Sequence, residues 1–221
     1  PYLGGGEKRI GVVTGGQGQR WFNATLTGRE SHAGTTPMHL RKDALLGAAR
    51  IVDAVNKIGM DNQPFACATV GMVESYPNSR NVIPGKVFMT VDLRHPNDDI
   101  LAKMDAELVE AVNKITSDIG LELDFDPFWY YAPIKFEDSC VEAVRAGVEV
   151  NGYSTRDMVS GAGHDACYLS KVTPTGMIFI PCVDGISHNE VEDAKPEWVE
   201  AGGQVLLQAM ITKADESILG S

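Results

Sequence analysis

The strongest constraint on the fold is the order of hydrophobic patterns between Arg20 and Tyr131. A strand-like alternation, "RWFNATLTG", is followed by apolar residues at helical spacing from Ala44 to Val55. Two further strand patterns, "FACATVGMVES" and "KVFMTVDLRH", precede a second helical stripe and a last strand, "LELDFDPFWYY". This β-α-β-β-α-β order predicts a four-stranded antiparallel sheet with both helices on one face, the ferredoxin-like arrangement.

Local signals predict which face of the first strand is buried and where the two helices begin and end. Phe22, Ala24 and Leu26 alternate with polar residues, so they are expected to share one face of their strand. Gly59 is expected to end the first helix, because glycine is favoured just past a helix C-terminus. Asn97 is expected to cap the second helix through its side-chain oxygen.

From Lys135 onward the patterns are those of an α/β domain. Two helices are expected in "SCVEAVRAGVEVNG" and after the glycines of "SGAGHDACYLSK", and a last one from about Pro196 to Ala214. The apolar run "TGMIFIPC" predicts a strand buried on both faces of a parallel or mixed sheet. One strong strand cannot build a two-sided sheet, so this segment is expected to close a larger α/β domain.

Composition excludes some classes of partner. The chain has 221 residues and a net charge of −11, which argues against a nucleic-acid partner. No apolar run approaches the roughly 20 residues that span a bilayer, so no membrane partner is expected. The four cysteines lack C-x-x-C spacing and predict reduced core residues in a cytoplasmic protein. A catalytic thiol at Cys167, near His164, is the alternative, and a buried structural residue is favoured.

Two polar clusters lie in the first predicted domain. His32 stands in the loop "GRESHAGTTP", where small neighbours allow close approach to a ligand, whereas His39 is expected to be a surface residue. Asn81 precedes a predicted strand that Arg94 ends, so both are expected at one sheet edge. The planar fork of Arg94 suits a carboxylate. A turn-forming Asn and a surface Arg are the alternative.

Two more clusters lie in the second region. Glycines before a helix in "SGAGHDA" expose backbone N–H groups that can bind an anion or a carbonyl. In "DGISHNEVED", His188 follows the predicted buried strand and precedes Glu190, Glu192 and Asp193. The carboxyl end of such a strand is where α/β active sites form, so His188 is a candidate metal ligand.

Four blocks occur in a fixed order: "IGVVTGGQGQRWFNATLTGRESHAGTTPMHLRKDAL", "NVIPGKVFMTVDLRHP", "SGAGHDA" and "GISHNEVED". In this order they resemble the hydantoinase/carbamoylase amidases of the M20 metallopeptidase superfamily. That group includes N-carbamoyl-L-amino-acid hydrolases, β-ureidopropionases and allantoate amidohydrolases. The resemblance implies a homodimeric enzyme with an α/β catalytic domain and an inserted ferredoxin-like domain that dimerises. The implied segments are catalytic over 1–19, dimerising over 20–133 and catalytic again over 134–221.

The resemblance also implies roles for individual residues. His188 resembles the last metal ligand, and His32 resembles the histidine that reaches a neighbouring subunit's active site and stabilises the oxyanion of the tetrahedral intermediate. The implied substrate contacts are Asn81, Arg94, Gly163, His164 and, as a further contact, Gln19. The implied cofactors are two divalent metal ions, Zn²⁺ or Mn²⁺, with Co²⁺ or Ni²⁺ as alternatives.

The implied reaction is hydrolysis of a ureido C–N bond on a small carboxylate. An N-carbamoyl-L-amino acid is the first expectation, and allantoate and 3-ureidopropionate are the alternatives. The remaining metal ligands of the family lie in an N-terminal half, and this chain begins at "PYLGGG". We therefore expect an incomplete metal site in this chain, which by itself would be a non-catalytic dimerisation or binding fragment.

Overall fold

The computed structural model describes residues 8–219 and divides into two compact units. Unit 1 combines the described residues up to Gln17 with those from Ile134 onward, and unit 2 is Gly18–Pro133. The chain thus passes between the units at residues 17/18 and 133/134, whereas the segments implied by the resemblance change at 19/20 and 133/134. Among the described residues, no helix is both long and apolar enough to cross a membrane.

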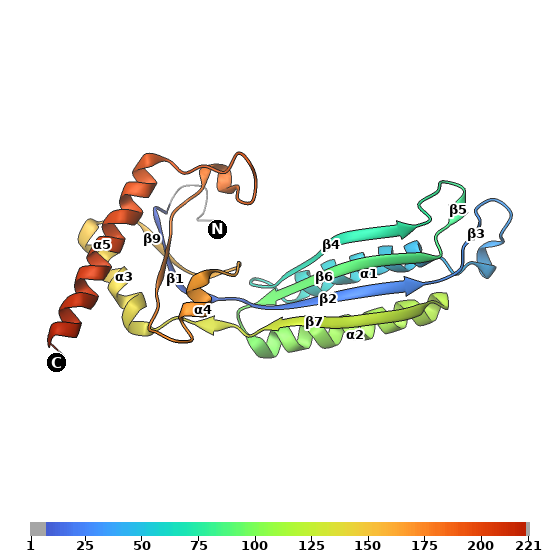
Figure 1. The fold of residues 1–221 in the computed structure, drawn as a ribbon, viewed down its shortest axis with the longest axis horizontal. Coiled ribbons are helices and arrows are strands. Elements are labelled where there is room, and N and C mark those ends of the chain that lie inside the picture. Colours follow the sequence, from blue (N-terminus) through green and yellow to red (C-terminus); the bar gives the residue numbers. More distant parts are fainter. Residues whose placement is uncertain (1–7, 220–221) are drawn as a thin grey trace. The chain divides into compact units, whose positions relative to one another are not determined.

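Unit 2 is an antiparallel sheet with helices on one face (Figure 1). The strand order is β4-β6-β2-β7, and every neighbouring pair is antiparallel. Along the chain the elements follow the expected strand-helix-strand-strand-helix-strand order. Their bounds are β2 (Gly18–Thr27), α1 (Ala44–Asp61), β4 (Cys67–Tyr76), β6 (Lys86–His95), α2 (Asp98–Ile119) and β7 (Glu122–Tyr131).

One core holds this unit together. Phe22, Ala24 and Leu26 are buried against the helices, which confirms the predicted inner face of β2. Met104 and Leu108 of α2 are fully buried in the same cluster. Burial of a large apolar side chain stabilises a fold by about 1.5–3 kcal/mol, so these contacts fix the sheet on its helices.

The start of α2 and the end of α1 each test one of the local predictions. Asn97 accepts the N–H of Ile100 through Oδ1 at 3.1 Å, so the predicted cap of α2 is confirmed. The prediction for Gly59 is wrong, because α1 continues to Asp61. An added Cβ at Gly59 would lie 3.0 Å from the Cβ of Ala68, so this glycine serves close packing of helix on strand.

A small second sheet lies at one end of unit 2, beyond the C-terminal end of β2 (Figure 1). Strand β3 (Ser31–His32) pairs with β5 (Val82–Ile83), and a single 3-10 turn, η1 (Met38–Leu40), follows β3. We call residues 28–41 and 76–85 the tip of unit 2. Sequence patterns did not predict this pairing, because two-residue strands carry no periodicity.

Unit 1 contains a mixed sheet around one central strand. Strand β1 pairs in parallel with β9 and antiparallel with β8 and β10. Helices α3 and α5 pack on each other and on this sheet. The bounds are β1 (Ile10–Gly16), β8 (Ile134–Lys135), α3 (Asp138–Asn151), β9 (Thr155–Ser160), α4 (Asp165–Leu169), β10 (Met177–Phe179), the 3-10 turn η2 (Val183–Gly185) and α5 (Pro196–Leu219).

Two predictions for buried residues are wrong. The apolar run around β10 forms only a three-residue strand whose side chains are half-buried, although the expected mixed sheet is present. Among the described residues this strand pairs only with β1, so it lies at an edge of the sheet and is less covered than an inner strand. Cys67 is exposed, because its side chain points to the face of the unit 2 sheet opposite the helices. Cys167 is buried, as expected.

Candidate functional site

The tip brings His32 and Asn81 together. His32 pairs with Val82 between β3 and β5, and the N–H of Ala33 donates to the backbone carbonyl of Asn81 at 2.9 Å. Paired strands lie about 4.8 Å apart, so the two polar side chains arise from adjacent backbone segments. Both side chains are exposed. The structure therefore joins two residues that are 49 positions apart in the sequence.

The ring of His32 is held in one orientation by its own loop. Its Nδ1 accepts the backbone N–H of Gly34 at 3.0 Å and that of Thr35 at 3.3 Å. A neutral imidazole that accepts at Nδ1 carries its proton on Nε2. The tip thus presents an exposed N–H donor of fixed direction, which is the group needed to stabilise developing negative charge on an oxygen.

Arg41 holds this loop, and sequence reasoning did not identify it. Its terminal nitrogen donates to the carbonyls of Ala33 (2.7 Å) and Thr36 (2.9 Å), and its Nε donates to Thr36 at 3.1 Å. The planar guanidinium suits such a multiple contact better than an ammonium group does. The only signal in the sequence was a cationic residue shortly after a Gly/Thr-rich loop.

Asn81 offers its amide group next to Val82, the residue that is opposite His32. The hydroxyl of Ser79 donates to Oδ1 of Asn81 at 3.0 Å. This contact orients the side chain and leaves the Asn81 amide nitrogen as the donor that can meet a ligand.

Arg94 lies at the opposite end of unit 2 from Asn81, so the prediction of one shared sheet edge is wrong. Strand β6 begins at Lys86, after the tip, and Arg94 is its ninth residue. Eight residues of extended strand cover about 26 Å. Strand β6 is also an inner strand of the sheet, paired with β2 and β4.

Four residues form a row across this end of the sheet, which we call the base row. Gln19 and Cys67 are both opposite Arg94, and Tyr131 is opposite Gln19. Directly opposed residues share a face, so the row lies on the face away from the helices. Arg94 also binds Asp92, with Nε 3.0 and 3.1 Å from the two carboxylate oxygens and a terminal nitrogen 2.6 Å from Oδ2.

In unit 1, His164 precedes α4 and carries a buried, unsatisfied nitrogen. Its backbone carbonyl accepts the N–H of Cys167 at 2.9 Å, and its ring lies 5.4 Å from the ring of Phe179. Within the described residues, its Nε2 is buried without a hydrogen-bond partner. A buried polar atom without a partner is costly, so this nitrogen is suited to meet a ligand or water. Gly163, next to it, is exposed.

His188 lies in an exposed loop with an unusual backbone conformation. Its φ is 56°, a region uncommon for residues other than glycine, and its N–H donates to Oε2 of Glu192 at 2.9 Å. This contact ties the loop together but does not involve the imidazole. Among the residues that the structure describes, no three His, Cys, Asp or Glu side chains form a group that could hold a metal ion.

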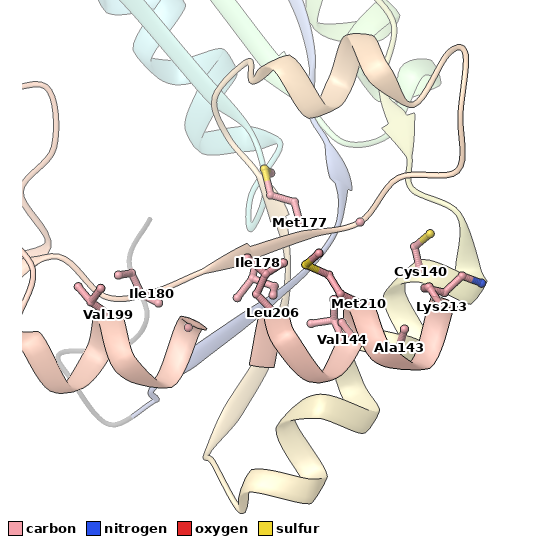
Figure 2. A pocket seen from close by; sticks show the side chains of 13 residues that line it. Cys140, Ala143, Val144, Met177, Ile178, Ile180, Val199, Leu206, Met210 and Lys213 are labelled. Carbon is pink, nitrogen blue, oxygen red and sulfur yellow. The ribbon is translucent and has the colours of Figure 1, made fainter. Parts of the chain in front are cut away.

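Unit 1 also contains an apolar cavity of 560 Å³ between α3, α5 and β10 (Figure 2). Figure 2 shows Val144 of α3, Ile178 of β10, and Leu206 and Met210 of α5 around it. Among the described residues that line it, Lys213 is the only charged one. The described lining residues include none of the carboxylates, imidazoles and amides that would position a polar ureido substrate, so we do not take this cavity as the candidate active site.

Comparison with known proteins finds one peptidase family and several amidohydrolases that are similar to this chain. A model of "Peptidase family M20/M25/M40" matches residues 4–212. An N-carbamoyl-L-amino-acid amidohydrolase of Rhizobium meliloti is 46% identical over 97% of this chain and 52% of its own length. An allantoate amidohydrolase of Escherichia coli is 38% identical over 83% of this chain and 44% of its own length.

Solved structures agree. An amidase of the hydantoinase/carbamoylase family from Burkholderia multivorans has a TM-score of 0.93 and 62% identity, over 97% of this chain and 52% of its own. The chain therefore spans about half the length of the curated relatives and structures that it matches.

Proposed function

The chain belongs to peptidase family M20/M25/M40, and we propose that its protein hydrolyses the C–N bond of a ureido group on a small carboxylate. The reaction would convert an N-carbamoyl-L-amino acid and water into the free amino acid, CO₂ and ammonia. Sequence identity to amidohydrolases named for this substrate class supports the assignment. Four regions of the chain would contribute: the tip, the base row, the loop before α4 and the His188 loop.

The observation that carries the proposal is the fixed donor at the tip. His32 is exposed and carries its proton on Nε2, because Nδ1 accepts two backbone N–H groups. Water attack on the ureido carbon would place negative charge on the ureido oxygen. We propose that His32 stabilises this oxyanion, with the Asn81 amide as a second donor beside it.

The base row would bind the other end of the substrate. Arg94 presents a guanidinium, which pairs bidentately with carboxylates. Gln19 is opposite Arg94 and only 8% exposed, so its amide would reach only a ligand bound at the same row. His164 and Gly163 of unit 1 would be substrate contacts of the catalytic unit, where the unsatisfied Nε2 of His164 supplies a polar group.

The separation of tip and base argues for a homodimer. His32 and Arg94 are separated along unit 2 by at least the eight-residue span of β6, about 26 Å, and a small ureido carboxylate is much shorter. One copy of unit 2 therefore cannot apply both residues to one substrate. We propose that a second copy supplies His32 and Asn81 to each site.

Unit 2 has a surface suited to that dimer. Strand β4 is an edge strand of ten residues, and an exposed edge is a template for pairing with another chain. It carries exposed Met72, Val73 and Tyr76. We propose that unit 2 is the dimerising domain and unit 1 part of the catalytic domain.

The described residues do not by themselves form a metal site. His188 belongs to no group of three His, Cys, Asp or Glu side chains among them, so they would account for substrate binding and charge stabilisation but not for activation of water. We propose that His188 is one ligand of a divalent metal site, Zn²⁺ or Mn²⁺, whose other ligands are not among the described residues. Metal content of the His188→Ala variant, measured in the complete gene product, tests this.

An assay with three substrates tests the proposed activity. N-carbamoyl-L-alanine, 3-ureidopropionate and allantoate would be compared with the complete gene product, with Zn²⁺ or Mn²⁺ supplied. We expect turnover of the first to exceed that of the other two. Absence of turnover of all three, in a folded and metal-loaded protein, would contradict the proposal.

A second candidate function is a non-catalytic dimerisation or binding module. The absence of a metal-binding group among the described residues favours it for the 221-residue chain alone. Equilibrium dialysis of this chain against Mn²⁺ or Zn²⁺ distinguishes the two. Micromolar binding together with turnover would exclude the non-catalytic module.

We also propose a cytoplasmic location. All four cysteines are free thiols, and thiols persist in reducing compartments. Detection of the protein in the soluble cytoplasmic fraction of its source cell would support this, and recovery outside the cytoplasm would contradict it.

A further inference from the structure

We infer that Asp92 is a positioning residue that holds the Arg94 guanidinium in the direction from which it binds the substrate carboxylate. The inference rests on the proposed function, because it assigns to Arg94 the carboxylate of the substrate. It adds a residue that neither the sequence motifs nor the relatives' names identify. The contacts of the Asp92 carboxylate, its strand position and its neighbours carry it.

The first observation is the shape of the contact. Three N···O distances of 2.6–3.1 Å join Nε and one terminal nitrogen of Arg94 to the two oxygens of Asp92. Such a fork-to-fork contact fixes the plane of the guanidinium as well as its position. The plane of the guanidinium that a ligand carboxylate would meet is therefore already set.

The second observation is that Asp92 is itself held. It stands two residues before Arg94 on β6, on the same face, with Trp21 opposite on β2 and Thr69 opposite on β4. The Trp21 ring lies 5.9 Å from that of Trp129. Strand pairing on both sides and a large aromatic neighbour restrict the Asp92 side chain, so its carboxylate is a fixed anchor.

The third observation is partial burial of the pair. The side chains of Arg94 and Asp92 are 25% and 28% exposed, so both are accessible to a small molecule but not fully solvated. Asp92 also lines a 290 Å³ cavity with Trp21, Thr69, Gly71, Thr90 and Phe128 on the sheet face away from the helices. Solvent screens such a partly exposed ion pair, so its contribution to stability is small and a role in orienting Arg94 is favoured.

Two effects of Asp92 on substrate binding oppose each other. Its negative charge repels the substrate carboxylate. Its hydrogen bonds order the Arg94 side chain before the substrate binds, so less conformational entropy is lost on binding. At a partly exposed site solvent and salt screen the repulsion, so we expect the ordering effect to be larger. The sign of the change in KM therefore distinguishes an anchor from a competing anion.

The test uses the complete gene product, loaded with metal, and the substrate pair N-carbamoyl-L-alanine and its carboxamide. For Asp92→Asn we expect KM for the acid to rise roughly 3- to 10-fold, with kcat changed less than about twofold. KM for the carboxamide, or its inhibition constant where it is not turned over, should stay unchanged. Asp92→Glu should restore part of the loss, because it returns the carboxylate.

Asp124→Asn is the matched control, because Asp124 is opposite Thr25, six residues along β2 from Gln19. This substitution should alter neither KM for the acid nor KM for the carboxamide. A lower KM for the acid in Asp92→Asn would show that Asp92 competes with the substrate. An equal rise for acid and carboxamide would show a general structural role. Either result overturns the inference.

Arg94→Ala separates this inference from the proposed function. A rise in KM confined to the acid supports carboxylate binding by Arg94, whatever Asp92 does. Equal effects of Arg94→Ala on acid and carboxamide would contradict the proposed role of Arg94 itself. If Asp92→Asn does not fold, Asp92→Glu is measured with the same substrate pair. Its carboxylate is displaced by one methylene group, so KM for the acid should rise above the wild-type value while KM for the carboxamide does not.

Discussion

The tip and the base of unit 2 carry their functional side chains in opposite ways. At the tip, His32 stands on a two-residue strand, and its loop is fixed by backbone N–H groups and by Arg41. At the base, Arg94 stands on a ten-residue strand that is paired on both sides, and only its guanidinium needs a further anchor.

This difference predicts how substitutions at the tip and at the base would each affect the kinetic constants. A strand with two neighbours keeps its register when one side chain changes, so changes at the base should affect ligand binding alone. The tip depends on a few hydrogen bonds within a loop, so loss of one partner there moves the imidazole. We therefore expect tip variants to lower kcat and base variants to raise KM.

The largest expected effect is that of His32→Ala. Removal of one donor to an oxyanion typically lowers kcat by about 100- to 1,000-fold, with a small change in KM. Steady-state kinetics of the complete gene product measure this. His39→Ala is the matched control, since His39 is exposed at the same tip, and it should retain activity. A rise in KM without loss of kcat would contradict the division between tip and base.

Arg41→Ala should have an intermediate effect. Without the contacts to Ala33 and Thr36 the loop loses its clamp, and we expect kcat to fall about 10-fold while the fold persists. Arg41→Lys should recover little, because an ammonium group cannot reproduce the fork. Arg50→Ala, on the exposed side of α1, is the control. Unchanged kcat in Arg41→Ala would show that the loop does not need the clamp.

The smallest effect concerns stability near the base. The Tyr130 hydroxyl donates to Asp98 at 2.8 Å, and this hydrogen bond raises the pKa of Tyr130 above its ordinary value of 10.0. A raised pKa means that the stabilisation is complete below pH 10 and is lost as pH rises through the raised value. Tyr130→Phe should cost under about 1 kcal/mol at neutral pH, because the contact is exposed.

Chemical denaturation of wild type and Tyr130→Phe at several pH values measures this cost. The difference in unfolding free energy should shrink as pH is raised past 10. A difference that stays constant with pH would show that the tyrosine acts only through packing. Tyr130→Phe should alter neither kcat nor KM, since Tyr130 faces the helices rather than the base row.

Much of unit 2 could be predicted because its signals are periodic. Alternation placed Phe22, Ala24 and Leu26 in the core, and the polar residue before α2 predicted the cap at Asn97. The prediction for Gly59 was wrong because glycine is favoured both at helix ends and at close contacts. Only the position of the neighbouring strand shows that Gly59 serves a close contact. The short apolar run at β10 misled because burial on both faces depends on a second layer that periodicity cannot show.

The candidate site was harder to predict for a different reason. Motif resemblance identified His32, Asn81 and Arg94, but sequence spacing placed Asn81 and Arg94 at one edge, when a whole strand separates them. Sequence patterns did not identify Arg41 or Asp92 as site residues, because Arg41 acts through contacts with backbone carbonyls and Asp92 through a contact with a guanidinium. Roles in substrate binding and in metal binding at His188 remain predictions.

The central claim is that the tip of one copy and the base of another act on one substrate. Co-expression of His32→Ala and Arg94→Ala forms of the complete gene product, with two affinity tags, allows mixed dimers to be purified. At a substrate concentration well below the KM of the Arg94→Ala form, each parent variant should be nearly inactive. A mixed dimer retains one intact site, so we expect about half of the wild-type activity. Mixed dimers no more active than the parent variants would contradict the claim.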